Sequence, residues 1–296
     1  MFNKVVIVGV GLLGGSLARD IRQHKLARHV VGVVRSQSTA QYALKEQVID
    51  AVQPLEEALE GADLIVLATP MQVMLPLLAS CAHLIPADAI VSDVGSVKTD
   101  LYAQLSATQP QLLKQFVLAH PIAGGESSGV SASRRGLFVN KHLIVTNTKE
   151  VSIGAVKAVS ELWQAVGAKV VAMSLHEHDA IFAKTSHLPH VVAFSLVNYL
   201  NAESNRDQLF DLAAAGFYDF TRIASSDAEM WRDICITNKD QVLSALDGYR
   251  AQLDEIRENI NASDQQGILD YFDSAKSARN AGLFKKSEDQ KTAKPA

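Results

Sequence analysis

The chain has 296 residues, of which 20 % are charged, and a formal net charge of −4. This length is enough for a large core and two domains. The charged residues form no basic block that could neutralise a phosphate backbone, so nucleic-acid binding is not expected. No apolar run is long enough to span a bilayer, so we expect no membrane association. Cys81 and Cys235 lack metal-ligand spacing, and without an export signal they indicate free thiols in the cytoplasm.

The first recognisable motif is a glycine-rich turn near the N-terminus. An apolar run over 5–8 is typical of a strand buried on both faces, and it leads directly into the spacing G-x-G-x-x-G. The first glycine permits a tight turn, the second lets the backbone approach a pyrophosphate, and the third lets the following helix, expected over 16–26, pack closely. The N–H groups of that helix would face the phosphates. We therefore expect a dinucleotide site that includes Gly9, Gly11, Leu12, Leu13 and Gly14.

The end of the second expected strand, over 30–34, indicates which dinucleotide is bound. A site for NAD has a carboxylate here, about 20 residues past the glycines, to hold the ribose 2′-hydroxyl. This chain has Val34 and Arg35 instead, followed by the hydroxyls of Ser36, Ser38 and Thr39. A guanidinium and several hydroxyls suit a 2′-phosphate, so NADP is favoured and NAD remains possible. Alternatively, Arg35 is a surface arginine that stacks on adenine.

Further apolar runs recur at the spacing of an α/β protein. They lie at 64–68, 89–93, 116–119, 142–146 and 169–172, with helical stretches between them. This alternation predicts a Rossmann-type domain with a mostly parallel sheet over residues 1–175. Ligands of such sheets bind beyond the carboxyl ends of the strands. Thr69 and Pro70, at one such end, are therefore expected to contact the cofactor.

Helical periodicity replaces the strand pattern after residue 175. We expect an all-helical substrate and dimerisation domain over 176–284, with a loop around Gly216, and a disordered tail over 285–296. One apolar seam has 4-3-4-3-4 spacing and is compatible with packing inside one chain or with a dimer contact. Its members are Val242, Leu246, Tyr249, Leu253, Ile256 and Ile260.

Two strand ends carry candidate catalytic residues. His120 follows the run 116–119 and precedes a Gly-Gly turn, where it could meet the nicotinamide. A histidine pKa near neutrality suits a general base that takes a hydroxyl proton. Alternatively, His120 only caps the turn. Ser96, after the run 89–93, could bind a substrate hydroxyl or could be a helix N-cap.

The helical half contains further polar candidates. His176, His178, His187 and His190 are close in sequence, but Pro189 indicates the first turn of a helix rather than a metal site, and no metal is expected. Arg222 lies among apolar neighbours, where an arginine needs a partner. That partner is either a carboxylate of this protein or a carboxylate of the substrate.

Together these motifs resemble the prephenate and arogenate dehydrogenases of tyrosine biosynthesis, the TyrA family. The matching segments are GVGLLGGSLA at 9–18, SDVGSVK at 92–98, HPIAGGESSG at 120–129, TSHLPH at 185–190, and DFTRIA and MWRDI within 219–234. They occur in order and extend over both expected domains. Each segment alone is less specific than the combination.

The resemblance implies a function and a role for each matching residue. A cyclohexadienol loses hydride to the nicotinamide while His120 takes its hydroxyl proton, and the ring then loses CO₂ and becomes aromatic. Ser96 would orient the hydroxyl, Arg222 would pair with a substrate carboxylate, and His187 would help bind the substrate. The resemblance also implies a homodimer.

The sequence departs from the family at the substrate loop and at the cofactor loop. Gly125 stands where many members have threonine, and Glu126 follows it, so substrate choice between arogenate and prephenate stays open. The stretch after the second strand resembles the NADP-using arogenate dehydrogenases. Neither a mutase segment nor an ACT-like segment is evident, so regulation through such a domain is not expected. The alternatives are another NADP-dependent hydroxyacid dehydrogenase and a non-catalytic NADP-binding module.

Overall fold

A computed structural model describes residues 1–125, 127–146 and 148–292, the stretch 283–292 by its backbone alone. The chain divides into two compact units, Met1–Gln241 and Val242–Ala296. Within the described ranges, no helix is both long enough and apolar enough to cross a bilayer.

The larger unit is built on an eight-stranded sheet. In chain order the strands are β1 (Phe2–Val8), β2 (Ala27–Val33), β3 (Ala51–Val52), β4 (Leu64–Leu67), β5 (Ile90–Asp93), β6 (Phe116–Pro121), β7 (His142–Thr146) and β8 (Lys169–Met173). Their order across the sheet is β3-β2-β1-β4-β5-β6-β7-β8, and every neighbouring pair is parallel except β6 and β7. The prediction of a mostly parallel sheet is confirmed.

The register brings the carboxyl ends of the central strands to one edge of the sheet. Val8, near the end of β1, pairs with Val33 of β2 and with Leu67 of β4. Leu67 in turn pairs with Asp93 at the end of β5, and β6 runs parallel to β5. The loops after β1, β2, β4, β5 and β6 therefore leave the sheet at the same edge.

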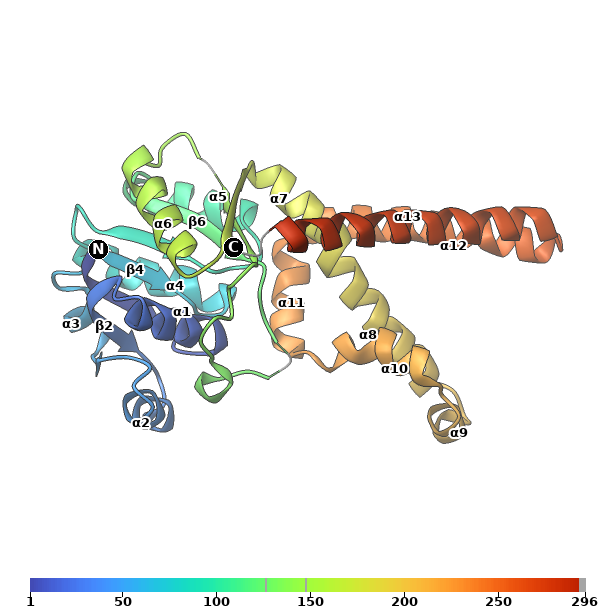
Figure 1. Cartoon of the computed structure of the whole chain (residues 1–296), viewed down its shortest axis with the longest axis horizontal. Helices are drawn as coiled ribbons and strands as arrows, with labels where there is room; N and C mark the ends of the chain where they lie inside the picture. The colour runs from blue at the N-terminus through green and yellow to red at the C-terminus, as the bar shows by residue number, and fades with distance from the viewer. Residues whose placement is uncertain (126, 147, 293–296) are drawn as a thin grey trace. The chain divides into compact units, whose positions relative to one another are not determined.

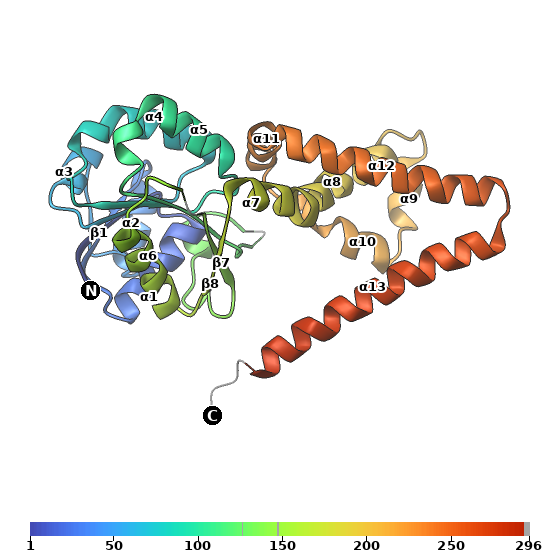
Figure 2. The same cartoon turned by 90° about the horizontal axis from the view of Figure 1, so that it is seen from above.

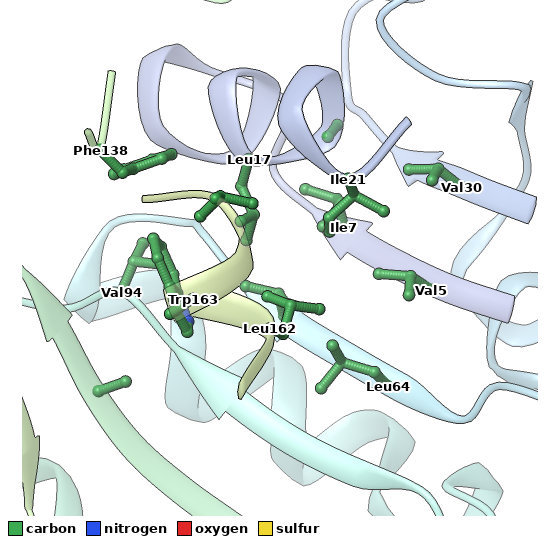
Figure 3. Packing of buried hydrophobic residues seen from close by; sticks show 14 of the residues in the cluster. Val5, Ile7, Leu17, Ile21, Val30, Leu64, Val94, Phe138, Leu162 and Trp163 are labelled. Carbon is green, nitrogen blue, oxygen red and sulfur yellow. The ribbon is translucent and has the colours of Figure 1, made fainter. Parts of the chain in front are cut away.

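Helices cover both faces of the sheet (Figure 2). They are α1 (Leu12–Gln23), α2 (Gln37–Lys45), α3 (Leu55–Leu59), α4 (Met71–Cys81), α5 (Thr99–Thr108) and α6 (Ile153–Ala165), with short 3₁₀ turns η1 (Ala82–Leu84), η2 (Pro110–Leu112) and η3 (Val130–Ala132). The core between β1 and the helices α1 and α6 includes Ile7, Leu17, Leu162 and Trp163 (Figure 3). A second core packs α3, α4 and α5 on the opposite face. Each fully buried aliphatic side chain contributes about 1.5–3 kcal/mol of hydrophobic stabilisation.

A run of helices follows the sheet in the same unit (Figure 1). They are α7 (Leu175–Phe182), the π-helix η4 (Ala183–His187), α8 (Leu188–Asn201), α9 (Arg206–Asp211), α10 (Ala215–Thr221), the 3₁₀ turn η5 (Arg222–Ser225) and α11 (Ala228–Thr237). The expected loop around Gly216 is wrong, because Gly216 lies in the first turn of α10. Since the first helical N–H groups have no intrahelical partner, a glycine costs less there than in a helix interior.

The second unit is formed by α12 (Lys239–Asn261), from Val242 onward, and by α13 (Gln265–Thr292). The two helices form a hairpin that opens away from its turn (Figure 2). Near the turn, the Tyr271 hydroxyl donates a hydrogen bond to the Gln252 carbonyl at 3.3 Å. The sequence predicts a disordered tail over 285–296, whereas α13 continues as far as Thr292 through a stretch rich in the good helix formers Lys, Glu and Gln. Residues 293–296 lie outside the described part.

Candidate active site

The glycine-rich turn after β1 forms an open cradle at the carboxyl edge of the sheet. Gly9 has φ +96°, and a Cβ there would lie 2.6 Å from the Ala68 carbonyl oxygen, so only glycine fits. A Cβ on Gly11 would meet nothing within 4 Å, which leaves open space above the turn. No side chain caps the N-terminus of α1, and the buried Thr69 hydroxyl has no partner among the described residues. These features fit a bound pyrophosphate.

The end of β2 supplies exposed polar groups beside this cradle. Arg35, Ser36 and Ser38 are exposed and directly follow the strand. The Ser36 hydroxyl oxygen accepts a hydrogen bond from the Thr39 N–H at 3.1 Å and so caps α2. It also lies 3.1 Å from the Ser38 hydroxyl. Ser36 therefore has a structural role that the sequence analysis did not assign, and no carboxylate is present at the strand end.

A buried ion pair fixes the backbone next to His120. The Lys98 ammonium contacts Asp93, and both side chains are fully buried. Lys98 also donates to the Ala119 carbonyl at 2.9 Å, while Asp93 accepts from the Ala119 N–H at 3.0 Å. Burial lowers the pKa of Lys98, and the Asp93 carboxylate opposes that shift. The pair thus holds both polar backbone groups of the residue that precedes His120.

His120 lies at the end of β6 and is hydrogen-bonded to a second histidine. Its Nδ1 lies 2.8 Å from Nε2 of His178 on α7. The other ring nitrogen of His178, Nδ1, lies 2.7 Å from Oδ1 of Asp179. Phe182 packs against both imidazoles, with ring centroids 5.0 Å from His120 and 4.7 Å from His178. His178 and Asp179 are buried, whereas His120 is partly exposed.

The surroundings of His120 keep its imidazole neutral. Burial lowers its pKa well below 6.5, and the nearby Lys98 ammonium lowers it further, as a proton on His178 or His187 would. The expectation of a pKa near neutrality is therefore wrong, because burial removes water from the imidazole and disfavours its charged form. The sequence does not reveal this burial. A neutral imidazole still has one unprotonated nitrogen and can act as a base.

A second pair of histidines lies at the end of the π-helix η4, which holds His187, and at the start of α8, which holds His190. Burial lowers the pKa of His187 to about 4, so this ring is neutral too. The Asn238 amide nitrogen donates to the Asp179 carbonyl at 3.0 Å and lies 3.1 Å from His187 Nδ1. Because this nitrogen is a donor, His187 Nδ1 accepts and its proton is on Nε2. His187 is therefore a hydrogen-bond donor through Nε2.

Arg222 is close to this second pair of histidines. His190 stacks on Trp231 with ring centroids 3.6 Å apart, and burial together with the charge of Arg222 lowers the pKa of His190. Arg222 is exposed at the start of η5, although its neighbours in sequence are apolar. The Trp231 indole N–H is buried without a partner among the described residues.

The remaining predicted residues lie in the loops after β5 and β6. Ser96 is half-buried and does not cap α5, whose N-cap position is Lys98. The cap for that helix comes instead from Asp179, which accepts from the N–H groups of Lys98 and Thr99 at 3.0 and 2.8 Å. A Cβ on Gly125 would lie 3.6 Å from Leu12, an ordinary contact, so a side chain fits there. Glu126 lies outside the described residues.

Pro70 occupies the N-cap position of α4, directly after Thr69 and next to the glycine-rich turn. No group of three or more His, Cys, Asp and Glu side chains in the described ranges could hold a metal ion. The histidines of the site are engaged with protein partners instead.

Comparison with known proteins identifies the family. Residues 17–172 match the nucleotide-binding domain of prephenate dehydrogenase, and residues 174–274 match the dimerization domain of the same enzyme. The chain belongs to the prephenate dehydrogenase family. It is thus an NAD(P)-dependent dehydrogenase of tyrosine biosynthesis.

Individual members of the prephenate dehydrogenase family match almost the whole chain. The chain is 35 % identical to the prephenate dehydrogenase of Bacillus subtilis over 95 % of its length and 76 % of the relative. It is 31 % identical to the cyclohexadienyl dehydrogenase of Zymomonas mobilis, over 95 % of this chain and 96 % of that one. A crystal structure of Aquifex aeolicus prephenate dehydrogenase with hydroxyphenyl propionate and NAD⁺ superimposes with a TM-score of 0.90, at 34 % identity, covering 95 % and 98 % of the two chains.

Several residues of the site were not singled out from the sequence. Lys98 and Asp93 lie in the segment 92–98 but were not recognised as a buried pair. The sequence placed His178 in a histidine cluster without assigning it a role at His120, because their contact joins residues far apart in the chain. The adjacent polar residues His178 and Asp179, on an otherwise buried helix face, are the sequence signal that could have indicated this role.

Proposed function

We propose that this enzyme catalyses the NAD(P)-dependent oxidative decarboxylation of arogenate and prephenate. The observation that carries the proposal is His120, a neutral and partly exposed histidine at the same sheet edge as the glycine cradle. A dehydrogenase of an alcohol needs a base for the hydroxyl proton beside the hydride acceptor. Relatives named prephenate and cyclohexadienyl dehydrogenase support this choice of substrates.

The nicotinamide supplies the hydride acceptor when the cofactor is bound. His120 takes the proton of the ring hydroxyl while C4 of the substrate loses hydride, which makes a ketone of the alcohol. The bond between the ring and its carboxylate then breaks, CO₂ leaves, and the bonding electron pair moves through the ring to the ketone oxygen, which takes a proton back from His120 to give the aromatic phenol. Ser96, after β5, orients the hydroxyl. Because aromatisation drives the second step, the chain needs no further acid or base for it.

Residues of η4, of η5 and of the loop after β6 bind the substrate. Arg222 pairs with a carboxylate that both substrates possess, and His187 donates a hydrogen bond through Nε2. Gly125 lines the substrate side chain, where the absence of a side chain leaves room for either the pyruvyl or the alanyl group. We therefore expect both substrates to react, with arogenate modestly preferred.

The cofactor preference is for NADP over NAD. Arg35 and the hydroxyl of Ser38 are exposed at the end of β2, and Ser36 begins α2 between them. The cradle of Gly9, Gly11 and Gly14, with Leu12, Leu13, Thr69 and Pro70, holds the pyrophosphate end of either cofactor. A guanidinium and the N-terminus of α2 favour an additional phosphate.

The enzyme works as a cytoplasmic homodimer assembled through its helical half, residues 176–282. Support comes from the match to the dimerization domain. Large apolar side chains exposed on the second unit, namely Leu253, Ile260, Leu269 and Phe272, supply surface for such a contact.

The substitution His120→Asn tests the assignment of the base. We expect kcat to fall by about 10²–10⁴, the usual contribution of a general base, with the affinity for NADP unchanged. Because the pKa of His120 is held well below 6.5, wild-type kcat/KM should stay level down through pH 6.5 and fall only as the pH drops through that lower pKa. Near-normal turnover by the variant would assign proton removal to another group.

A further inference from the structure

His178 and Asp179 extend inward from His120 as a continuous chain of hydrogen bonds. His120 Nδ1 to His178 Nε2 is 2.8 Å, and His178 Nδ1 to Asp179 Oδ1 is 2.7 Å. The relative exposure of His178 is 0 % and that of Asp179 is 2 %, so water cannot replace these partners. Two histidine nitrogens that face each other must carry one proton between them.

The contacts of Asp179 decide where that proton lies. Its carboxylate already accepts from two backbone N–H groups, those of Lys98 and Thr99. Burial alone would raise the pKa of Asp179, but these bonds and the bond from His178 together lower it, so the group is a carboxylate. A carboxylate only accepts hydrogen bonds. His178 must therefore donate through Nδ1.

This donation fixes the rest of the chain. A neutral His178 that is protonated on Nδ1 has a bare Nε2, and burial lowers the pKa of His178 so that it is neutral. The bare Nε2 accepts from His120, which must then be protonated on Nδ1. The unprotonated nitrogen of His120 is consequently Nε2, the one that is not engaged inside the protein.

We propose that His178 and Asp179 are positioning residues that hold His120 in the tautomer with a free Nε2 and stabilise the cation formed when this nitrogen takes the substrate proton. The inference rests on the proposed role of His120 as the base. The Lys98 ammonium disfavours a positive charge on His120. Asp179 is the carboxylate that can offset this effect, and it acts through His178. A carboxylate that only capped α5 would not need a histidine between it and the base.

Substitutions of His178 separate this role from a structural one. The amide of His178→Gln can accept from His120 and donate to Asp179, so it preserves the tautomer, whereas His178→Leu can do neither. We expect His178→Gln to keep kcat within about tenfold of the wild type and His178→Leu to lose about 10²–10⁴, the scale of misorienting a catalytic imidazole. His176→Leu is the matched control, because His176 is an exposed histidine on the same helix.

Nitrogen-15 NMR of the histidine-labelled enzyme gives a readout that packing alone would not change. The wild type and His178→Gln should show His120 protonated on Nδ1, whereas His178→Leu should shift it towards the Nε2-protonated form that free histidine prefers. The His120 resonance is assigned by its loss in His120→Asn. A wild-type His120 protonated on Nε2 would overturn the proposal, even if no variant of His178 folded.

The two proposals fail in different ways. If His120→Asn retains normal turnover, then the proposed base is wrong. If His120→Asn is inactive while a folded His178→Leu has wild-type kcat, then only the positioning role is wrong. Equal losses in the Gln and Leu variants with unchanged melting temperatures would also contradict the positioning role, since they would show that the matched hydrogen-bond pattern is irrelevant.

Discussion

The roles of His120 and His187 depend on which nitrogen of each imidazole ring carries the proton. His120 and His187 each have Nδ1 engaged with a protein partner, His178 in one case and Asn238 in the other. The partner sets the tautomer, so Nε2 of His120 can accept a proton while Nε2 of His187 can donate a hydrogen bond. Two residues of the same type thereby acquire opposite roles.

Arg35 is the residue on which the cofactor preference depends. The substitution Arg35→Ala should lower kcat/KM with NADP about tenfold or more and leave the value with NAD nearly unchanged, because a charge-assisted bond to the 2′-phosphate contributes about 1.5–3 kcal/mol. Steady-state kinetics with both cofactors measure the effect. Arg28→Ala is the control, since Arg28 is exposed near the other end of the same strand. Equal losses with both cofactors would show that Arg35 does not contact the 2′-phosphate.

Strand ends and helix starts cooperate to position the base. β6 carries His120, the end of β5 supplies Asp93 and the following loop supplies Lys98, which together hold Ala119, and α7 supplies His178 and Asp179. Asp179 also caps α5, so one carboxylate links α7 to the start of the helix that follows β5. The placement of the base is therefore a property of several elements.

The substitution Lys98→Met tests how much the buried ion pair between Lys98 and Asp93 contributes to stability. It leaves the Asp93 carboxylate buried without its counter-charge, so we expect the free energy of unfolding to drop by about 3–5 kcal/mol in urea denaturation. The double variant Asp93→Asn/Lys98→Met removes both charges and should lose less than the single variant. If the double variant is the less stable of the two, the unpaired charge is not the cause.

The strands and the glycine-rich turn could be predicted from the sequence because both depend on local patterns. Continuous apolar runs marked the strand regions, and the glycine spacing marked the turn after β1. β3 was not anticipated, since two partly buried residues give no periodicity. The first helix begins at Leu12, earlier than its apolar pattern indicated, because Gly11 serves as its N-cap.

The connections around His120 could not be predicted, because they join distant parts of the chain. The contact between His120 and His178 spans 58 residues, and that between Lys98 and Asp179 spans 81. No spacing rule relates such positions. The same reason applies to the pKa of His120, which depends on burial by α7 rather than on its own segment.

At the scale of the whole molecule, the helical half should carry the assembly. We expect sedimentation velocity at micromolar concentration to show a symmetric homodimer. Phe272→Glu should shift it towards monomer, because it adds a charge to an exposed apolar side chain of the second unit. Ile153→Glu, at the exposed start of α6, should leave the dimer intact. A wild-type monomer under these conditions would refute assembly through residues 176–282.

The central claim, oxidative decarboxylation, is tested most directly by measuring reduced cofactor and CO₂ together. Purified enzyme is given arogenate or prephenate with NADP, and NADPH and CO₂ are quantified in the same reaction. The account predicts equal amounts of the two products from each substrate, with the higher kcat/KM on arogenate. NADPH formation without CO₂ from both substrates would contradict it and would indicate a hydroxyacid dehydrogenase instead.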